Sequence, residues 1–259
     1  MADAVAIVAG ATGLVGQALV RELAAQSHWR EVRALVRHTL PPELSGPTVV
    51  PVQVDYARLD PPPLWAAADH VFCALGTTMR QAGSAAAFRR VDFEYAVSLA
   101  RATQAQGARH FLLVSALGAA PASRVFYDRV KGEVEAAIAA LGFRSVTIAR
   151  PSLLVGRRAE PRLAEQLGKV LGVIAPPRWK PVPAGRVSRA LVEAAKRDLP
   201  GLHILENRDL RMMPWLRRGP RHRANVAIQF ASQVLPPSSE NACSNRNECG
   251  VMFENMNRT

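Results

Sequence analysis

Near its start the chain carries Gly10-Ala11-Thr12-Gly13-Leu14-Val15-Gly16, with a glycine at every third position. An apolar run at residues 5–9, typical of a buried strand, precedes this motif, and apolar residues at helical spacing follow it over 14–26. The first glycine permits a tight turn, the second lets the backbone approach a ligand, and the third lets helix and strand pack closely. Free N–H groups at a helix start also attract anions. The motif therefore predicts a dinucleotide pyrophosphate site made by Gly10, Thr12, Gly13, Leu14, Val15 and Gly16, the alternative being a simple tight turn.

The rest of the chain up to residue 206 alternates between strand-like and helix-like segments. Further strands are predicted at 32–36, 49–54, 70–75, 111–114, 145–149 and 202–205. Helices are predicted at 88–106, 126–141, 162–171 and 187–197. This order predicts an α/β fold with a doubly wound parallel sheet, the Rossmann type, covered by helices on both faces. Residues 152–200, with a proline-rich loop at 175–183, are predicted to form a small C-terminal lid.

A change of composition divides the chain near residue 208. Residues 1–206 contain no asparagine, whereas residues 207–259 contain seven, together with two of the three cysteines. Residues 236–241 also have the composition of a disordered stretch. We therefore predict one domain over 1–208 that includes the lid, and a tail over 209–259 that is disordered or foreign to the domain.

Bulk composition excludes several classes of protein. The net charge is +12, but the 33 basic residues include only four lysines and are scattered along the chain, which favours a GC-rich codon bias over a specific nucleic-acid site. The chain has no apolar run long enough for a membrane span, and its acidic start does not resemble a signal peptide. Three cysteines are typical of a reducing compartment. A cytoplasmic protein without membrane or nucleic-acid partners is expected.

The end of the second predicted strand bears on the choice of cofactor. Sites specific for NAD place an acidic residue there to bind the ribose 2′-hydroxyl. This chain has Val36 followed by Arg37, and a guanidinium can pair with a 2′-phosphate. NADP(H) is therefore the preferred cofactor, with NAD(H) as the alternative. Asp55, after the third strand, is predicted either to border the adenine or to cap the following turn.

Three further residues form a pattern with a chemical meaning. Tyr127 and Lys131 are four positions apart, so they share one face of a helix, and Ser115 ends the preceding strand. An ammonium near a phenol lowers the phenol pKa toward neutrality. Such a tyrosine can exchange a proton with a carbonyl or an alcohol, and the serine can bind the same oxygen. Ser115, Tyr127 and Lys131 are the predicted catalytic residues.

These motifs resemble the short-chain dehydrogenase/reductase superfamily, and more closely its atypical members of the Tat-interacting-protein type. The resemblance covers about residues 4–208 and rests on the glycine motif and on Cys73-Ala74-Leu75-Gly76-Thr77-Thr78, Val125-Phe126-Tyr127, Val130-Lys131-Gly132-Glu133-Val134-Glu135, Ala149-Arg150-Pro151 and Leu205-Glu206-Asn207. It implies a catalytic role for Ser115, Tyr127 and Lys131. It also implies that Lys131 holds the nicotinamide ribose and that Tyr127, Leu75, Gly76, Thr77 and Pro151 line that end of the cofactor.

The chain departs from the superfamily in its middle helix, where many members use an asparagine and this chain has Asp92 near that position. The leading prediction is an NADP(H)-dependent oxidoreductase that acts on a small carbonyl or alcohol substrate. Members of this subgroup are also regarded as cofactor-binding regulators, so the first alternative is a non-catalytic NADPH-binding protein with a protein partner. The second is a sugar-nucleotide epimerase or dehydratase, which needs a larger C-terminal domain.

No metal site is predicted from the sequence. The six histidines show none of the spacings typical of metal ligands, and Cys243 and Cys249 have no further cysteine or histidine nearby. Cys73 lies in an apolar run and is expected to pack as a small hydrophobic residue.

Overall fold

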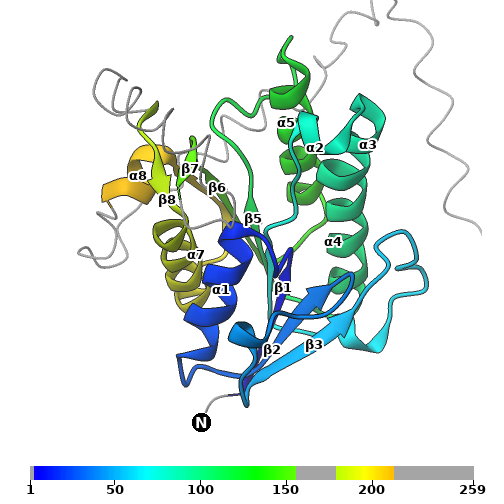
Figure 1. Cartoon of the computed structure of the whole chain (residues 1–259), viewed down its shortest axis with the longest axis vertical. Coiled ribbons are helices and arrows are strands. Elements are labelled where there is room, and N and C mark those ends of the chain that lie inside the picture. The colour runs from blue at the N-terminus through cyan, green and yellow to red at the C-terminus, as the bar shows by residue number, and fades with distance from the viewer. Residues whose placement is uncertain (1–2, 156–178, 213–259) are drawn as a thin grey trace, which may run out of the picture. The chain divides into compact units, whose positions relative to one another are not determined.

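The computed structural model describes residues 3–155 and 179–212. A seven-stranded parallel sheet runs through these residues in the order β3-β2-β1-β4-β5-β6-β9 (Figure 1). Its strands are β1 (Ala4–Ala9), β2 (Trp29–Val36), β3 (Val49–Gln53), β4 (His70–Cys73), β5 (His110–Val114), β6 (Ser145–Arg150) and β9 (Gly201–Glu206). Two short strands, β7 (Leu154–Val155) and β8 (Val182–Pro183), pair separately. The predicted doubly wound α/β fold is confirmed.

Helices cover both faces of the sheet, as Figure 1 shows. The helices are α1 (Leu14–Ala24), α2 (Met79–Ala82), α3 (Ala85–Arg89), α4 (Tyr95–Ala105), α5 (Phe126–Ala139), α7 (Ala184–Arg197) and α8 (Asn207–Met212), with short turns η1 (Pro42–Leu44), η2 (Leu64–Ala66) and η3 (Arg90–Glu94). Apolar residues of α1 and α7 pack on one face of the sheet, and those of α4 and α5 pack on the other. Both faces are therefore buried, which explains why the strands are continuously apolar rather than alternating.

The order of the strands locates the ligand edge. The chain passes from β1 outward to β2 and β3, then returns to β4 on the opposite side of β1. In such sheets ligands bind at the carboxyl ends of the strands, where this change of direction leaves a crevice. The glycine motif follows β1 and the segment with Gly76 follows β4, so the two predicted cofactor segments lie at this crevice.

The predicted long helix over 88–106 starts earlier and is not uniform. It runs through α3, η3 and α4, and η3 is a π-helical turn that contains Asp92. A π turn inserts one extra residue into a helix and is frequent at functional sites. Sequence periodicity predicts the helix but not this turn.

The predicted lid is only partly described. Residues 184–197 of that segment form α7, whose buried face packs in the core beside α1. They belong to the cover of the sheet rather than to a separate lid. The predicted helix at 162–171 and residues 175–178 of the predicted loop lie outside the described residues.

The domain extends slightly past the predicted boundary at 208. Helix α8 continues to Met212, and its Leu210 is fully buried in the core. Asn207 joins this end of the chain to the segment after β6: its side-chain oxygen accepts a hydrogen bond from Ser152 N at 2.9 Å, and its nitrogen donates one to Lys180 O at 3.0 Å. The folded domain therefore includes residues 209–212. The predicted tail from 213 onward lies outside the described residues.

Candidate functional site

The turn between β1 and α1 requires its glycines. Gly10 has a φ of +75°, and a Cβ there would lie 2.5 Å from Ala74 O. A Cβ on Gly16 would lie 1.9 Å from Gly10 O. Gly13 caps α1 without a side-chain hydrogen bond, and the first turn of the helix has no acidic residue. The backbone N–H groups at this helix start therefore suit an anion such as a pyrophosphate.

The other predicted residues of this segment differ in exposure. Thr12 is exposed, Leu14 is half-buried and Val15 is buried. The Thr12 carbonyl accepts a hydrogen bond from Gln17 Nε2 at 3.0 Å, which fixes the turn. Thr12 and Leu14 thus lie on the accessible side of the turn, whereas Val15 holds the helix against the sheet.

Arg37 and Asp55 lie beyond the neighbouring strands. Arg37 is exposed and comes directly after β2, as the prediction of a 2′-phosphate contact requires. Asp55 is also exposed, but its Oδ1 accepts a hydrogen bond from Ala57 N at 3.0 Å and its Oδ2 lies 3.6 Å from Arg58 Nε. Of the two roles predicted for Asp55, these contacts favour the turn cap.

Lys131 and Asp92 form a buried ion pair below the segment after β4. Lys131 Nζ lies 2.6 Å from Asp92 Oδ1, and the side chains are 7% and 0% exposed. Thr77 N donates a hydrogen bond to Asp92 Oδ2 at 2.9 Å. A Cβ on Gly76 would lie 3.5 Å from Asp92 Oδ1 and 3.7 Å from Lys131 Nζ. The structure therefore places predicted cofactor residue Gly76 beside predicted catalytic residue Lys131, and Thr77 against its partner Asp92.

Tyr127 lies one turn before Lys131 on α5, half-buried, with its ring 5.5 Å from that of Phe88. Burial raises the pKa of the Tyr127 phenol, Lys131 lowers it, and Asp92 and Asp128 raise it, so the pKa lies above its ordinary value. Burial also lowers the pKa of the Lys131 ammonium, but Asp92 and Tyr127 outweigh this effect and the pKa is raised. The sequence-based expectation of a lowered Tyr127 pKa is therefore wrong in this structure, because burial and Asp92 outweigh the effect of the ammonium.

Ser115 lies beside Glu135, which is one turn beyond Lys131 on α5. It is buried after β5, its N–H donates to Ala149 O at 2.8 Å, and its hydroxyl lowers the pKa of Glu135, although burial keeps that pKa raised. Glu135, one turn beyond Lys131, binds Arg150, with Nη2 and Oε2 2.6 Å apart. Arg150 in turn lies 3.2 Å from Glu206 Oε1. Pro151 follows Arg150, is buried, and its carbonyl accepts a hydrogen bond from Leu117 N at 2.8 Å.

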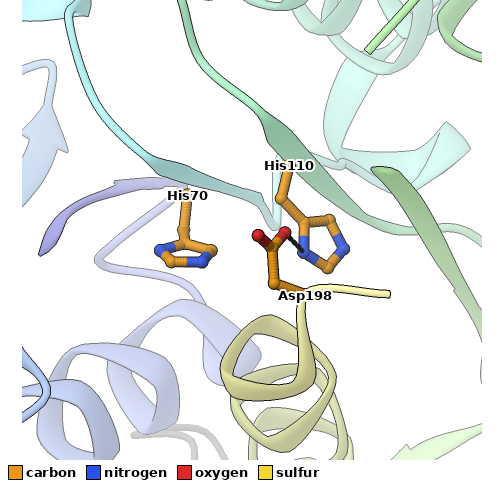
Figure 2. A group of neighbouring side chains, drawn as sticks. All are labelled: His70, His110 and Asp198. Carbon is orange, nitrogen blue, oxygen red and sulfur yellow. Dashed lines mark ion pairs between the residues drawn. The ribbon is translucent and has the colours of Figure 1, made fainter. Parts of the chain in front are cut away.

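A second cluster lies at the opposite, amino-terminal edge of the sheet. His70 starts β4, His110 starts β5, and Asp198 ends α7 in a left-handed conformation with a φ of +41°. Figure 2 shows the Asp198 carboxylate between the two rings; its Oδ1 lies 3.6 Å from His110 Nδ1. One ligand atom from each residue lies within 4.8 Å of the others, a geometry that a metal ion could use.

The hydrogen bonds of His70 argue against a metal at this cluster. Burial lowers the pKa of His70 to about 4 and that of His110 to about 3, so both rings are neutral near neutral pH. Trp29 Nε1 donates to His70 Nδ1 at 3.3 Å, which places the single proton of the neutral ring on Nε2. His70 then has no free lone pair for a cation, whereas a metal-binding histidine donates its second N–H to an acceptor. The cluster is better described as a buried polar end of the core, in which His110 Nδ1 and Asp198 Oδ1 face each other without a hydrogen bond.

The fold and the site together define a class of protein. The strand order, the glycine turn and the open helix start at the crevice are those of a Rossmann-type protein that holds a dinucleotide. The chain matches the family described as "NAD(P)H-binding" over residues 10–170 and belongs to that family.

Curated relatives match this chain over most of its length. Protein HTATIP2 of Rattus norvegicus is 35% identical over 205 residues, which cover 77% of this chain and 84% of the relative. The protein FMP52 of Coccidioides immitis, named as mitochondrial, is 33% identical over 220 residues, covering 75% and 86%. None of the described helices has the length and apolar character needed to cross a membrane.

Solved structures share the fold at lower identity. MoeE5 in complex with UDP-glucose and NAD superposes with a TM-score of 0.61 at 18% identity and covers 78% of this chain and 75% of its own. Vestitone reductase from alfalfa gives a TM-score of 0.57 at 16% identity, covering 78% and 76%. The neighbours thus include both a sugar-nucleotide complex and a reductase, and at these identities they show the shared fold alone.

Sequence reasoning missed several contacts of the site. The sequence shows Asp92 only as a residue near the position of the superfamily's asparagine, and nothing in its spacing predicts the pairing with Lys131. One feature of the sequence does indicate a role for Glu135 in the site. It follows Tyr127 and Lys131 at the same spacing of four residues, which places three polar groups on one face of the helix.

Proposed function

We propose that this protein is an NADP(H)-dependent oxidoreductase that acts on a small carbonyl or alcohol substrate, with Tyr127 as the residue that transfers the proton. One observation carries this proposal. The buried Lys131–Asp92 pair lies directly under Gly76, at the carboxyl edge of the sheet, one helical turn from Tyr127. A phenol, an ammonium and an open backbone segment are thereby grouped at the crevice of a family that binds NAD(P)H.

Different residues of the chain would bind the cofactor and transfer the proton. The glycine turn and the start of α1 would hold the pyrophosphate, and Gly76, Thr77 and Pro151 would border the nicotinamide end. Bound NADP(H) would supply or accept a hydride. Lys131 has three N–H donors, of which Asp92 engages one side, so the remainder would hold a ribose hydroxyl. Tyr127 would give a proton to the substrate oxygen or take one from it.

A substrate screen with NADPH tests the proposal, read as loss of nicotinamide absorbance. Tyr127→Phe should reduce the rate about a hundredfold or more while NADPH binding is unchanged, because the variant lacks the proton donor. Tyr95→Phe is the matched control, since Tyr95 stacks on Tyr56, with ring centroids 5.7 Å apart. Equal rates for wild type and Tyr127→Phe would refute the assignment of Tyr127.

The preference for NADPH over NADH is a separate part of the proposal and rests on Arg37. A charge-assisted contact between its guanidinium and a 2′-phosphate should contribute roughly 1.5–3 kcal/mol, or about ten- to a hundredfold in affinity. Arg37→Ala should weaken NADPH by that factor and leave NADH almost unchanged in calorimetric titrations. Arg58→Ala is the control, because Arg58 is exposed nearby but pairs with Asp55. Equal weakening of both cofactors would refute this role.

A second candidate function is that of an NADPH-binding regulator that does not turn over substrate and contacts a protein partner. The raised pKa of Tyr127 supports this candidate against alcohol oxidation alone, because a protonated phenol cannot accept a proton from an alcohol but can give one to a carbonyl. Tight NADPH binding without turnover of any carbonyl or alcohol would support it. A substrate-sized cavity above Tyr127 would favour the enzyme, and a filled one would favour the regulator.

A sugar-nucleotide epimerase ranks third. The resemblance to MoeE5 shows the fold alone, and the described residues after β6 provide only α7, α8 and short strands around β9. We expect no specific nucleic-acid partner, and a cytoplasmic location stays a prediction beside the mitochondrial names of the FMP52 relatives.

A further inference from the structure

Asp92 and Lys131 form a buried ion pair beneath an exposed glycine at the crevice. The Asp92 side chain, in the π-helical turn η3, is fully buried, with Oδ1 2.6 Å from Lys131 Nζ and with Oδ2 accepting the Thr77 N–H at 2.9 Å. Gly76 is exposed, and a Cβ on it would lie 3.5 Å from Asp92 Oδ1 and 3.7 Å from Lys131 Nζ. A ligand group that rests on Gly76 would therefore lie close to both charges of the pair.

The two charges of this pair offset each other. The other titratable groups that act on Lys131 are Tyr127 and Cys73. Both are neutral at neutral pH, because burial raises the pKa of the Tyr127 phenol and raises that of the Cys73 thiol to about 11. The net charge beneath Gly76 is therefore close to zero. An asparagine, which many members of the superfamily use near the position of Asp92, would leave the ammonium without a partner.

The two redox forms of a nicotinamide cofactor differ in charge at the ring. Addition of a hydride converts the cationic pyridinium of NADP⁺ into the neutral dihydropyridine of NADPH, while the pyrophosphate and the 2′-phosphate stay the same. An unpaired ammonium near the ring would repel the oxidised form and leave the reduced form almost unaffected, because the energy between two charges scales with their product. A neutral pair removes this repulsion.

We propose that Asp92 is a specificity-determining residue for the redox state of the cofactor: by neutralising Lys131, it lets the cationic ring of NADP⁺ bind beside Gly76 and Thr77. This inference rests on the proposed position of the nicotinamide end, but its test needs neither a substrate nor turnover. NADP⁺ and NADPH have the same adenosine half, so a comparison between them is also independent of Arg37.

The main test measures the dissociation constants of NADP⁺ and NADPH for the full-length protein, by calorimetry and by nicotinamide fluorescence. Asp92→Asn should raise the ratio of the NADP⁺ constant to the NADPH constant about four- to fifteenfold, the effect of unit charges about 10 Å apart at an effective dielectric constant of about 20 to 40. Asp128→Asn is the control. It removes a half-buried carboxylate of the same helix whose Cγ lies 3.4 Å from the Cβ position of Gly118, and it should change the ratio less than about twofold. An unchanged or lowered ratio in Asp92→Asn would overturn the proposal.

A second variant keeps the test decisive if the unpaired ammonium prevents Asp92→Asn from folding. Lys131→Gln removes the ammonium and keeps the carboxylate with its hydrogen bond from Thr77 N. Both cofactors should bind more weakly, because the ribose contact is lost, but the ratio should shift in the opposite direction, in favour of NADP⁺. The double variant Asp92→Asn, Lys131→Gln should return the ratio to about the wild-type value. An unchanged ratio in Lys131→Gln, or a shift in the same direction as in Asp92→Asn, would overturn the proposal.

A fragment without nicotinamide separates an effect of charge from general damage to the site. The compound 2′,5′-ADP carries only the adenosine half, so the wild type and Asp92→Asn should bind it equally. Equal weakening of 2′,5′-ADP, NADP⁺ and NADPH would mean that Asp92 has a structural role, and it would overturn the proposal. Failure of the wild type to bind either dinucleotide would refute the proposed function and this inference with it, whereas binding of both with an unchanged ratio in the variants would refute the role of Asp92 alone.

Discussion

Acidification should destabilise the folded protein through His70 and His110. Both rings are buried, with 3% and 1% of their surface exposed, and burial lowers their pKa values from 6.5 to about 4 and about 3. The unfolded chain therefore binds protons more readily than the folded chain between about pH 6.5 and pH 4. The free energy of unfolding should be constant above this window and fall as the pH decreases through it.

The size of the effect follows from the two pKa shifts. At about pH 5, the pH lies about 1.5 units below the unfolded pKa of each histidine, while both rings are still neutral in the folded state. Each histidine then lowers the free energy of unfolding by about 2 kcal/mol, at about 1.4 kcal/mol per pKa unit. The two together should lower the free energy of unfolding by about 4 kcal/mol relative to neutral pH. This is a large part of the roughly 5–15 kcal/mol that stabilises a typical domain.

Urea unfolding at neutral pH and at about pH 5, followed by circular dichroism, measures this loss. The double variant His70→Gln, His110→Gln removes both titrating groups and should lose correspondingly less stability on acidification. His38→Gln, which changes an exposed histidine after β2, is the control and should behave as the wild type. The reasoning is refuted if the double variant and the wild type lose the same free energy. In that case Asp198, 3.6 Å from His110 Nδ1, would stabilise the protonated ring in place.

Three further changes test other parts of the structure. Gly16→Ala should abolish NADPH binding in a fluorescence titration, because its Cβ would lie 1.9 Å from a backbone oxygen of the turn, whereas Gly185→Ala, with nothing within 4 Å, should bind normally. Glu135→Ala should lower the free energy of unfolding by about 3–5 kcal/mol, since it leaves Arg150 without its main buried partner; a loss below about 1 kcal/mol would contradict the burial of this pair. Truncation after Met212 should preserve cofactor affinity and the thermal midpoint, and an unfolded product would show that later residues belong to the domain.

Much of the fold could be predicted from local patterns. The glycine motif, the apolar strands and the helical periodicity each depend on neighbours within a few residues, so they are visible in the chain itself. The same holds for Tyr127 and Lys131, because a spacing of four residues places two side chains on one helix face in any α-helix. For the predicted elements that the structure describes, the ends agree to within a few residues, and the alternation of strands and helices predicts the parallel sheet.

The partners of these residues depend on tertiary structure. Asp92 reaches Lys131 from another helix through a π turn, and Glu135 meets Arg150 only because β6 lies beside α5. His70, His110 and Asp198 come from three elements that are neighbours only in the assembled sheet. No spacing along the chain records such contacts, because they arise from the strand order and from the way the helices pack. The protonation state of Tyr127 belongs to the same category: burial and an acidic neighbour distant in sequence determine it, and both exist only in the folded chain.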